Sequence, residues 1–445
     1  MNRLIVNTVT CTLIGLLSIP AMAQNPAKKP TLSPSQAVLA HEKRWIGTWA
    51  TAPQPFMPGS LQSFRNQSLR LIVHTSAGGT KVRIKISNTF GDRPLLIGGA
   101  HIARRTAAAD IDPTSDRTLM FHGGKSTTVP ARSMVVSDPV ELDVPALSDL
   151  AISLFLPKST EATTLHILAM QTSYVSSDTG DSTADVKFPV AKTIHSWPFL
   201  TGVDVAASAQ GATVIAFGSS LTDGDGSTLD ANRRWPDVLA ERLQKGAGGN
   251  TEEVGVLNQG IIGNRLLNDS PRQAGSPFGA ALGQAGLVRF ERDVLAQAGV
   301  RYVIVGLGIN DIVFPGSLTP LTERVSAESM KSGYRQLIRR AHQKGIRVIG
   351  TTNPPFENAF LVFSETGPPV TFYSPEKEIV RQEVNDWIRS SREFDDVLDF
   401  DGILRDPSHP TRLLPIYDSG DHLHPNNAGY IAAGNAIPLA LLEGH

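Results

Sequence analysis

A serine in a glycine-containing loop and an Asp-x-x-His pair near the C-terminus are the residue types of nucleophilic catalysis. Ser220 follows Gly218 by two positions, and Asp421 precedes His424 by three. A serine hydroxyl is a weak nucleophile near neutral pH and needs an adjacent base, while the imidazole needs a carboxylate to fix its tautomer. One short loop can supply both groups, so the sequence predicts a catalytic triad of Ser220, His424 and Asp421.

The segment before Ser220 predicts where its hydroxyl lies. Thr213 to Phe217 is a continuous apolar run, typical of a strand buried on both faces. Ligands of open parallel sheets bind at the carboxyl ends of the strands, so we expect Ser220 at that edge. Gly218 permits a tight exit from the strand, and the neighbouring N–H groups can point at a developing negative charge. A phosphate-binding loop would carry Gly-Lys-Ser, which the loop around Ser220 lacks.

The same C-terminal loop offers an alternative, because Asp421, His422 and His424 also carry metal-ligand atoms. No second cluster of His and Asp is evident, and a metal would leave Ser220 unexplained. We therefore predict neither a metal nor a cofactor, and we assign His422 no role. Three further carboxylates near the predicted site are expected to make turn and cap hydrogen bonds: Asp223, Asp225 and Asp311.

Four segments, in this order, resemble the sequence blocks of the SGNH/GDSL hydrolase family. They are Gly218-Ser219-Ser220-Leu221, Asn258-Gln259-Gly260-Ile261-Ile262-Gly263-Asn264, Gly308-Ile309-Asn310-Asp311 and Asp421-His422-Leu423-His424. The resemblance covers residues 211–442. It implies that Ser220 attacks an ester, that His424 and Asp421 complete the triad, and that the N–H groups of Ser220 and Gly263 and the Asn310 amide form an oxyanion hole.

One position departs from the family's Gly-Asp-Ser-Leu pattern, since Ser219 stands where the aspartate is usual. That aspartate is not a triad member, so the departure concerns hydrogen bonding of the loop. A more literal match, Gly180-Asp181-Ser182, has no buried strand before it and no amphipathic helix after it. We expect Ser182 to lie in a solvated loop.

The spacing of apolar residues differs between two parts of the chain. Residues 81–86 alternate strictly between charged and apolar side chains, and similar short runs at 69–74, 135–142 and 149–156 are separated by Gly and Pro turns. These runs predict an antiparallel all-β sandwich or jelly-roll-like domain over residues 45–205. Apolar strands then alternate with helices, which predicts a doubly wound parallel sheet, with helices expected over 235–244 and 426–442 and a strand over 397–400. Together with the resemblance, this implies an SGNH hydrolase domain over 206–445 with a flavodoxin-like sheet.

The N-terminal residues resemble an export signal. Arg3, the apolar run Val9 to Ile19 and Ala21-Met22-Ala23 predict a signal peptide over 1–23, and a Pro- and Lys-containing flexible leader over 24–44 follows. The apolar run is shorter than the roughly 20 residues that span a bilayer. We therefore expect a periplasmic or secreted protein without a stable membrane anchor. Cys11, the only cysteine, would leave with the signal peptide, so no disulfide is expected.

The amino-acid composition limits the classes of substrate that we expect. The 41 basic and 42 acidic residues leave a net charge of −1, which offers no broad basic surface for nucleic acid. We expect a small-molecule or glycan-linked ester substrate, with short-chain or carbohydrate-linked acyl esters favoured, cleaved through an acyl-enzyme. Two alternatives stay open: acyl transfer to a sugar hydroxyl, and glycan binding with a vestigial hydrolase domain. Trp45, Trp49 and Phe56 either pack in the core or form a carbohydrate platform. The sequence leaves the oligomeric state open.

Overall fold

Two antiparallel sheets make up the β-rich region, residues 44–207, of the computed structural model. The structure describes residues 44–177, 180–246, 254–271, 276–363 and 367–442, so the predicted signal peptide and nearly all of the predicted leader lie outside it. The first sheet contains β1 (Arg44–Ala50), β18 (Leu200–Ala207), β4 (Gly79–Ser87), β10 (Met134–Val136) and β11 (Val140–Val144). The second contains β16 (Val190–Ile194), β15 (Ser173–Ser176), β3 (Gln67–His74), β12 (Asp149–Leu156), β6 (Gly99–Ala107), β7 (Asp110–Ile111) and β8 (Arg117–Thr118).

The inner faces of these sheets share one hydrophobic core, to which β3, β4, β12 and β18 all contribute, as expected of a sandwich. Short strand pairs flank the sheets: β2 (Ser63–Phe64) with β13 (Thr160–Glu161), β14 (Leu165–His166) with β17 (Trp197–Pro198), and β5 (Leu95–Ile97) with β9 (Thr127–Val129). One turn of 3₁₀ helix, η1 (Pro113–Ser115), lies between β7 and β8.

Two details of the β-rich region differ from the prediction. The run 135–142 is divided between β10 and β11, and Pro139, which has no N–H for a strand ladder, lies in the gap. The charged face of β4 is only partly solvated. Lys85 is 7% exposed, and its Nζ lies 2.8 Å from Asp204 Oδ1 and 3.1 Å from Gln297 Oε1 of the α/β region. Alternation alone could not show that another part of the chain covers this face.

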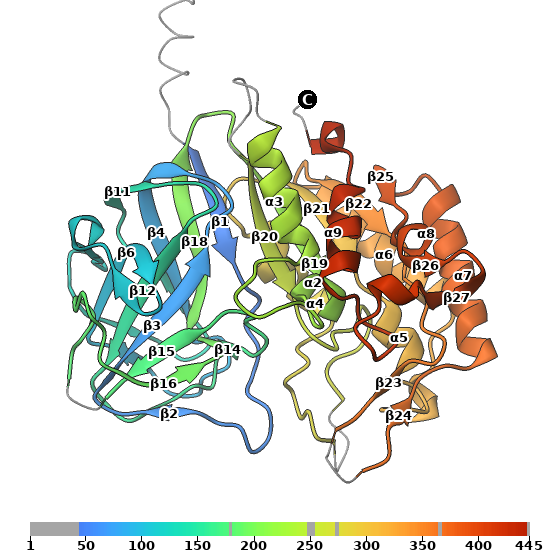
Figure 1. Cartoon of the computed structure of the whole chain (residues 1–445), viewed down its shortest axis with the longest axis horizontal. Helices are drawn as coiled ribbons and strands as arrows, with labels where there is room; N and C mark the ends of the chain where they lie inside the picture. The colour runs from blue at the N-terminus through green and yellow to red at the C-terminus, as the bar shows by residue number, and fades with distance from the viewer. Residues whose placement is uncertain (1–43, 178–179, 247–253, 272–275, 364–366, 443–445) are drawn as a thin grey trace, which may run out of the picture. The chain divides into compact units, whose positions relative to one another are not determined.

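A five-stranded parallel sheet organises the α/β region, as predicted (Figure 1). Its strand order is β20 (Val254–Gly260), β19 (Ala212–Gly218), β21 (Val300–Gly306), β22 (Arg347–Thr351) and β25 (Asp396–Leu398). In chain order this is 2-1-3-4-5, the flavodoxin-like arrangement. The fold class predicted from the sequence, an antiparallel β-rich region followed by this parallel sheet, is confirmed.

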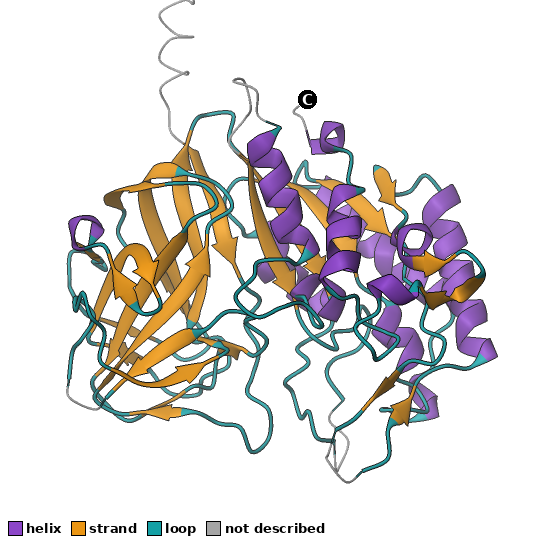
Figure 2. Cartoon of the chain, in the orientation of Figure 1, coloured by secondary structure: helices purple, strands orange, loops and turns teal. Residues whose placement is uncertain are grey.

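Helices cover both faces of the parallel sheet (Figure 2). One face packs against α4 (Gly286–Phe290), α6 (Ala327–His342) and α7 (Pro375–Ser390), and the other against α3 (Trp235–Lys245), α8 (Phe400–Leu404) and α9 (Asn427–Asn435). The predicted last helix, 426–442, ends early at Asn435, and Pro438 separates it from a short turn, η5 (Leu439–Leu442). No helix among the described residues is long and apolar enough to cross a membrane.

The remaining elements lie around the sheet edge. They are α2 (Ser220–Asp223), α5 (Ile309–Val313), the π-helical turn η2 (Glu291–Leu295), the 3₁₀ turns η3 (Leu321–Glu323) and η4 (Pro415–Tyr417), and two hairpins, β23 (Phe360–Leu361) with β24 (Val370–Thr371) and β26 (Arg405–Asp406) with β27 (His409–Leu413).

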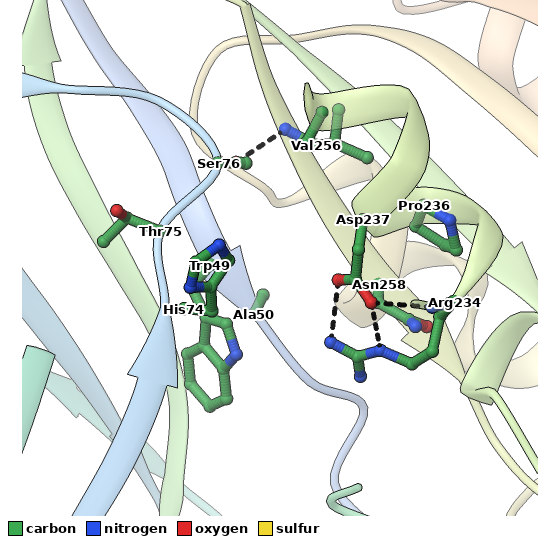
Figure 3. Close-up of a pocket in the computed structure, with 11 residues that line it drawn as sticks. Trp49, Ala50, His74, Thr75, Ser76, Arg234, Pro236, Asp237, Val256 and Asn258 are labelled. Atoms are coloured by element: carbon green, nitrogen blue, oxygen red, sulfur yellow. Dashed lines mark hydrogen bonds and ion pairs between the residues drawn. The ribbon is translucent and has the colours of Figure 1, made fainter. Parts of the chain in front are cut away.

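The β-rich and α/β regions belong to one compact unit and meet along β1 and β20. The Gly47 N–H donates to Thr213 Oγ1 at 3.0 Å. The Val256 N–H donates to Ser76 Oγ at 2.9 Å, a contact that Figure 3 shows. A Cβ atom on Gly255 would lie 1.9 Å from the carbonyl oxygen of Gly47, so only glycine allows this approach. The predicted domain boundary at residues 205 and 206 is therefore crossed by close backbone contacts, and it stays a prediction.

Candidate active site

Ser220 begins α2 at the carboxyl end of β19, an inner strand of the parallel sheet. All residues of that strand are buried, and Ser220 itself is 3% exposed. The turn is tight because Thr222 folds back over the strand end, where a Cβ atom on Gly218 would lie 2.0 Å from Thr222 Oγ1. A glycine is thus required immediately before the turn that presents the Ser220 hydroxyl.

The loop before α9 brings His424 and Asp421 to this hydroxyl. His424 Nε2 lies 2.9 Å from Ser220 Oγ, and His424 Nδ1 lies 2.6 Å from Asp421 Oδ2. The second carboxylate oxygen of Asp421 accepts the backbone N–H groups of Leu423 and His424 at 2.9 and 2.8 Å. The three residues singled out in the sequence are therefore hydrogen-bonded in a chain, with the parts needed for nucleophilic catalysis.

The cap of α9 holds this loop in place. Asn426 Oδ1 accepts the backbone N–H groups of Ala428 and Gly429, and its Nδ2 donates to the carbonyl oxygens of Ile416 and Asp418. Asn is among the best N-cap residues because its side chain satisfies N–H groups that the helix leaves free. The cap therefore fixes the chain two residues after His424.

Electrostatics favour an ionised Asp421 and a basic His424. Burial raises the pKa of Asp421, but the His424 side chain and the two backbone N–H groups outweigh this effect and lower it to about 2. Burial likewise lowers the pKa of His424, while Asp421 and Asp225 raise it to a net value above the ordinary one. Asp225 Oδ2 lies 3.7 Å from His424 Nε2. The sequence predicted only a turn role for Asp225, because its approach to His424 depends on the tertiary fold.

Loops after the two strands that flank β19 carry the predicted oxyanion donors. Gly263 follows β20, and Asn310 lies in α5 after β21, so both reach the same sheet edge as Ser220. Gly263 has a φ of +70°, and a Cβ atom there would lie 2.6 Å from Leu282 Cδ1, so glycine is required. Among the described residues, neither the Ser220 N–H nor the Gly263 N–H has a hydrogen-bond partner.

Among the described residues, one hydrogen-bond partner holds the Asn310 amide nitrogen. Its Nδ2 donates to the carbonyl oxygen of Asn264 at 2.9 Å, and an amide nitrogen has a second N–H to give. Asp311, in the next position, is fully buried and accepts the backbone N–H groups of Leu266 and Leu267 at 2.6 and 2.9 Å. Its contacts are thus those of a loop anchor, although burial raises its pKa to about 6.

Asp223 links the nucleophile helix to two other parts of the molecule. Its Oδ2 accepts the Ile262 N–H at 2.8 Å, which fits the expected structural role. Its Oδ1 lies 2.9 Å from Nε2 of His166, a residue of the β-rich region. Sequence reasoning missed His166, since nothing in its local pattern connects it with a segment more than fifty positions away.

The literal Gly-Asp-Ser match does not reach this site. Ser182 lies beside β3, where its backbone N–H donates to Ser68 Oγ at 2.9 Å. It is only 6% exposed, so the expectation of a solvated loop is wrong. Because the neighbouring residues are polar, the sequence did not indicate that other parts of the β-rich region cover Ser182.

In the described part of the chain, no group of three His, Cys, Asp or Glu side chains is placed to hold an ion. The interpretation of the C-terminal loop as a metal site therefore has no support there. His422 turns away to Asp418, with Nδ1 2.5 Å from Oδ2. Of the aromatic residues proposed as a sugar platform, Trp49 is 5% exposed and packs edge-on against Trp197 in the core. Trp45 stacks with Arg83 at the edge of the first sheet.

An apolar cluster borders the site. It joins the segment after Gly263 with the segment after Asn310 and with Leu423, the neighbour of His424. Its members include Met57, Ile262, Phe278, Leu282, Ile309, Val313, Phe314, Phe356 and Leu423. The segments that follow Gly263 and Asn310 therefore pack together, and Met57 of the β-rich region packs with them.

Residues 216–432 match the GDSL-like lipase/acylhydrolase family. No curated protein matches the chain. Solved structures similar to it include an aryl esterase from M. smegmatis (16% identity, 51% of this chain and 96% of that one, TM-score 0.36), a putative arylesterase from Agrobacterium tumefaciens (23%, 52% and 98%, 0.35) and the carbohydrate acetylesterase Est24 from Sinorhizobium meliloti (17%, 52% and 99%, 0.37).

The family match spans β19 to α9, so it includes every segment that carries a residue of the candidate site. The family predicted from the sequence is confirmed. Residues 216–432 therefore form a GDSL-like lipase/acylhydrolase domain of the SGNH hydrolases, and the protein is a carboxylic ester hydrolase.

Proposed function

We propose that the protein cleaves esters by two-step acyl transfer at Ser220. His424 takes the Ser220 proton, and Ser220 Oγ bonds to the ester carbonyl carbon. The alcohol then leaves with the proton from His424. In the second step His424 takes a proton from a water molecule, which attacks the acyl carbon. The bond to Ser220 Oγ then breaks, His424 returns the proton to Ser220 Oγ, and the acid is released. The observation that carries this proposal is the 2.9 Å contact between His424 Nε2 and Ser220 Oγ.

The oxyanion of each tetrahedral intermediate is held, in this proposal, by the N–H groups of Ser220 and Gly263 and by the Asn310 amide. Support comes from their common sheet edge and from the two backbone N–H groups having no partner among the described residues. Donors already aimed at the developing charge need no reorganisation during the reaction, which is why such sites accelerate acyl transfer strongly.

We propose short-chain or carbohydrate-linked acyl esters as substrates. The apolar cluster around Leu423 suits a small acyl group. A cavity of about 560 Å³ adjoins the other side of the catalytic loop, where Asp418, Gly420 and His422 line it together with Glu357 and Arg412. Side chains of this kind suit the hydroxyl groups of a sugar alcohol better than a second acyl chain.

The test is ester hydrolysis by residues 24–445 with a panel of aryl esters of graded acyl length and with acetylated sugars. Ser220→Ala should lower kcat by about a million-fold, which leaves only the residual rate that substrate binding and the oxyanion hole supply. Ser182→Ala is the matched control, because it removes the serine of the literal motif, and its kcat should equal that of the wild type. An active Ser220→Ala variant would contradict the proposal.

Product analysis separates hydrolysis from transfer. With an unesterified sugar present, we expect free acid as the product and no newly acylated sugar. Accumulation of the acylated sugar in place of acid would show that the same site transfers the acyl group to a hydroxyl.

A further inference from the structure

His166 reaches the nucleophile helix from the β-rich region. It lies in β14, its side chain is 2% exposed, and its ring packs against Trp197 with the ring centroids 5.7 Å apart. Its Nε2 lies 2.9 Å from Oδ1 of Asp223, the last residue of the helix that Ser220 begins. A side chain outside the α/β region therefore contacts the element that carries the nucleophile.

Both ring nitrogens of His166 face oxygen atoms that accept hydrogen bonds. Nδ1 lies 2.9 Å from the carbonyl oxygen of Ala52, and Nε2 faces the Asp223 carboxylate and, at 3.2 Å, the carbonyl oxygen of Leu168. A neutral imidazole has a single N–H, so only the imidazolium satisfies both sides. Burial lowers the pKa of His166 and Arg234 adds to this, but Asp223 and the Ala52 carbonyl raise it to a net value above the ordinary one.

Asp223 connects His166 with the loop that carries Gly263. While Oδ1 faces His166, Oδ2 accepts the Ile262 N–H at 2.8 Å, and Ile262 immediately precedes Gly263. The direction of the Gly263 N–H depends on where the preceding residue is held. An Asp223 side chain without its partner could turn about its own bonds and release the Ile262 amide.

A second contact supports the same loop from the β-rich region. Gln54 is fully buried; its Oε1 accepts the Ile167 N–H at 3.1 Å, and its Nε2 donates to the carbonyl oxygen of Ala281 at 2.7 Å. The next residue, Leu282, is the side chain that approaches Gly263 most closely. The segment around His166 thus holds both sides of the loop that carries Gly263.

We propose that His166 is a positioning residue for acyl transfer: its imidazolium fixes Asp223, and Asp223 fixes the Gly263 N–H in the oxyanion hole. The inference rests on the proposed function, because it presupposes an oxyanion at this site. His166 transfers no proton and touches no substrate. The β-rich region is then a part of the catalytic apparatus, as well as a neighbour of the hydrolase fold.

Two substitutions of His166 test whether its hydrogen bond to Asp223 matters, or only the volume of its side chain. His166→Gln retains a donor near the position of Nε2, which faces Asp223, whereas His166→Asn retains one near Nδ1, which faces Ala52. Because displacement of a catalytic group by about 1 Å costs on the order of a hundredfold, we expect His166→Asn to lower kcat by about tenfold to a hundredfold with KM nearly unchanged. His166→Gln should keep several times more activity than His166→Asn.

The control is His101→Gln. His101 Nδ1 lies 3.0 Å from Asp116 in the β-rich region, so this variant loses a comparable pair without affecting the α/β region, and its kcat should equal that of the wild type. In an Asp223→Asn background, His166→Asn should lower kcat no further, since residues that act through one another are not additive. All rates are taken per active serine, counted by the burst of product from an activated aryl ester, and thermal unfolding is recorded for each variant.

Equal kcat values for His166→Gln and His166→Asn, or additive losses with Asp223→Asn, would overturn the inference. If His166→Asn does not fold, Asp223→Ala replaces it, because it removes the same link from the other side; a wild-type kcat in that variant would also overturn the inference. Ser220→Ala, measured in the same series, keeps the two hypotheses apart. An active Ser220→Ala variant would contradict the proposed function. If Ser220→Ala is inactive but His166→Asn is fully active, only the positioning role of His166 is contradicted.

Discussion

Asp225 is a second carboxylate, beside Asp421, whose charge acts on the proposed base. Its carboxylate lies 3.7 Å from His424 Nε2 and raises the pKa of that imidazole. Because the base must be neutral to accept the Ser220 proton, activity falls as the pH drops through the His424 pKa. Asp225→Asn removes the negative charge and lowers this pKa, so the acid limb of the kcat/KM profile should move to lower pH.

A matched change of charge tests whether this effect is local. Asp116→Asn also removes one carboxylate but lies in the β-rich region beside His101, and it should leave the acid limb in place. An acid limb that stays unchanged in Asp225→Asn would mean that Asp225 does not act on His424.

Asn310 provides a second prediction at the scale of the residue. Asn310→Ala removes the only side-chain donor of the proposed oxyanion hole, so kcat should fall by about a hundredfold to a thousandfold, with KM changed little. The variant also loses the contact with the Asn264 carbonyl, and thermal unfolding should be measured beside the kinetics. A kcat equal to that of the wild type would remove Asn310 from the oxyanion hole.

Local patterns in the sequence were sufficient to single out Ser220, His424 and Asp421, which the fold brings into contact, because each lies in a short segment with its own turn and cap residues. Asp225 and His166 could not be assigned in this way. Their environments form only when α2, the loop before α9 and β14 come together, and a single sequence does not show such approaches.

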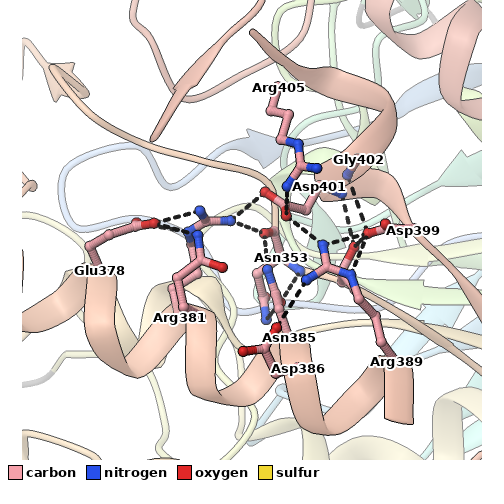
Figure 4. A network of polar contacts seen from close by, with 12 residues as sticks. Asn353, Glu378, Arg381, Asn385, Asp386, Arg389, Asp399, Asp401, Gly402 and Arg405 are labelled. Carbon is pink, nitrogen blue, oxygen red and sulfur yellow. Dashed lines mark hydrogen bonds and ion pairs between the residues drawn. The ribbon is translucent and has the colours of Figure 1, made fainter. Parts of the chain in front are cut away.

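At the scale of the elements, a buried ion-pair network joins α7 to α8 and to the segment that follows β22 (Figure 4). Asp401 is fully buried and lies 2.6 Å from Arg381 Nη1 and 2.5 Å from Arg389 Nη2. Its backbone N–H donates to Thr352 Oγ1 just after β22. The network therefore supports the sheet edge on which the proposed site stands.

Removing the central carboxylate should be costly. Asp401→Asn leaves Arg381 buried with less compensation for its charge, and breaking one partner of a buried pair typically costs about 3–5 kcal/mol of unfolding free energy. Asp386→Asn is the control: its side chain is 75% exposed and 3.4 Å from Arg389, so we expect a loss below about 1 kcal/mol. Denaturant unfolding measures both, and equal losses would contradict the structural role of Asp401.

Helices and strands with a regular spacing of apolar residues were predictable from the sequence. The residues at which such elements end were less predictable. The strand at 149–156 and the helix at 235–244 lie where their apolar spacing placed them, within one residue. The end of β25 at Leu398 was not expected, because the Asp399 side chain accepts the Gly402 N–H and starts α8 instead. Capping of this kind is decided by a single hydrogen bond, which periodicity does not register.

For the whole molecule, the close approach of β1 and β20 makes the β-rich and α/β regions interdependent. Gly255 and Gly47 pack backbone to backbone, and polar contacts at Thr213 and Ser76 lie beside them. Because these contacts are buried and shared, we expect the wild type to unfold in one cooperative transition when its heat capacity is followed by calorimetry.

Gly255→Ala tests that interdependence. The added Cβ atom would meet the Gly47 carbonyl oxygen at 1.9 Å, so β1 must move away from β20, at a cost of about 1–3 kcal/mol. The control is Gly124→Ala, whose Cβ atom would meet only backbone oxygens at 3.4 and 3.5 Å in a hairpin turn, and its stability should change little. If the two regions are one cooperative unit, Gly255→Ala lowers the unfolding temperature of the whole transition. Separation into two transitions, with the second at the wild-type temperature, would show that the α/β region is stable without its β-rich neighbour.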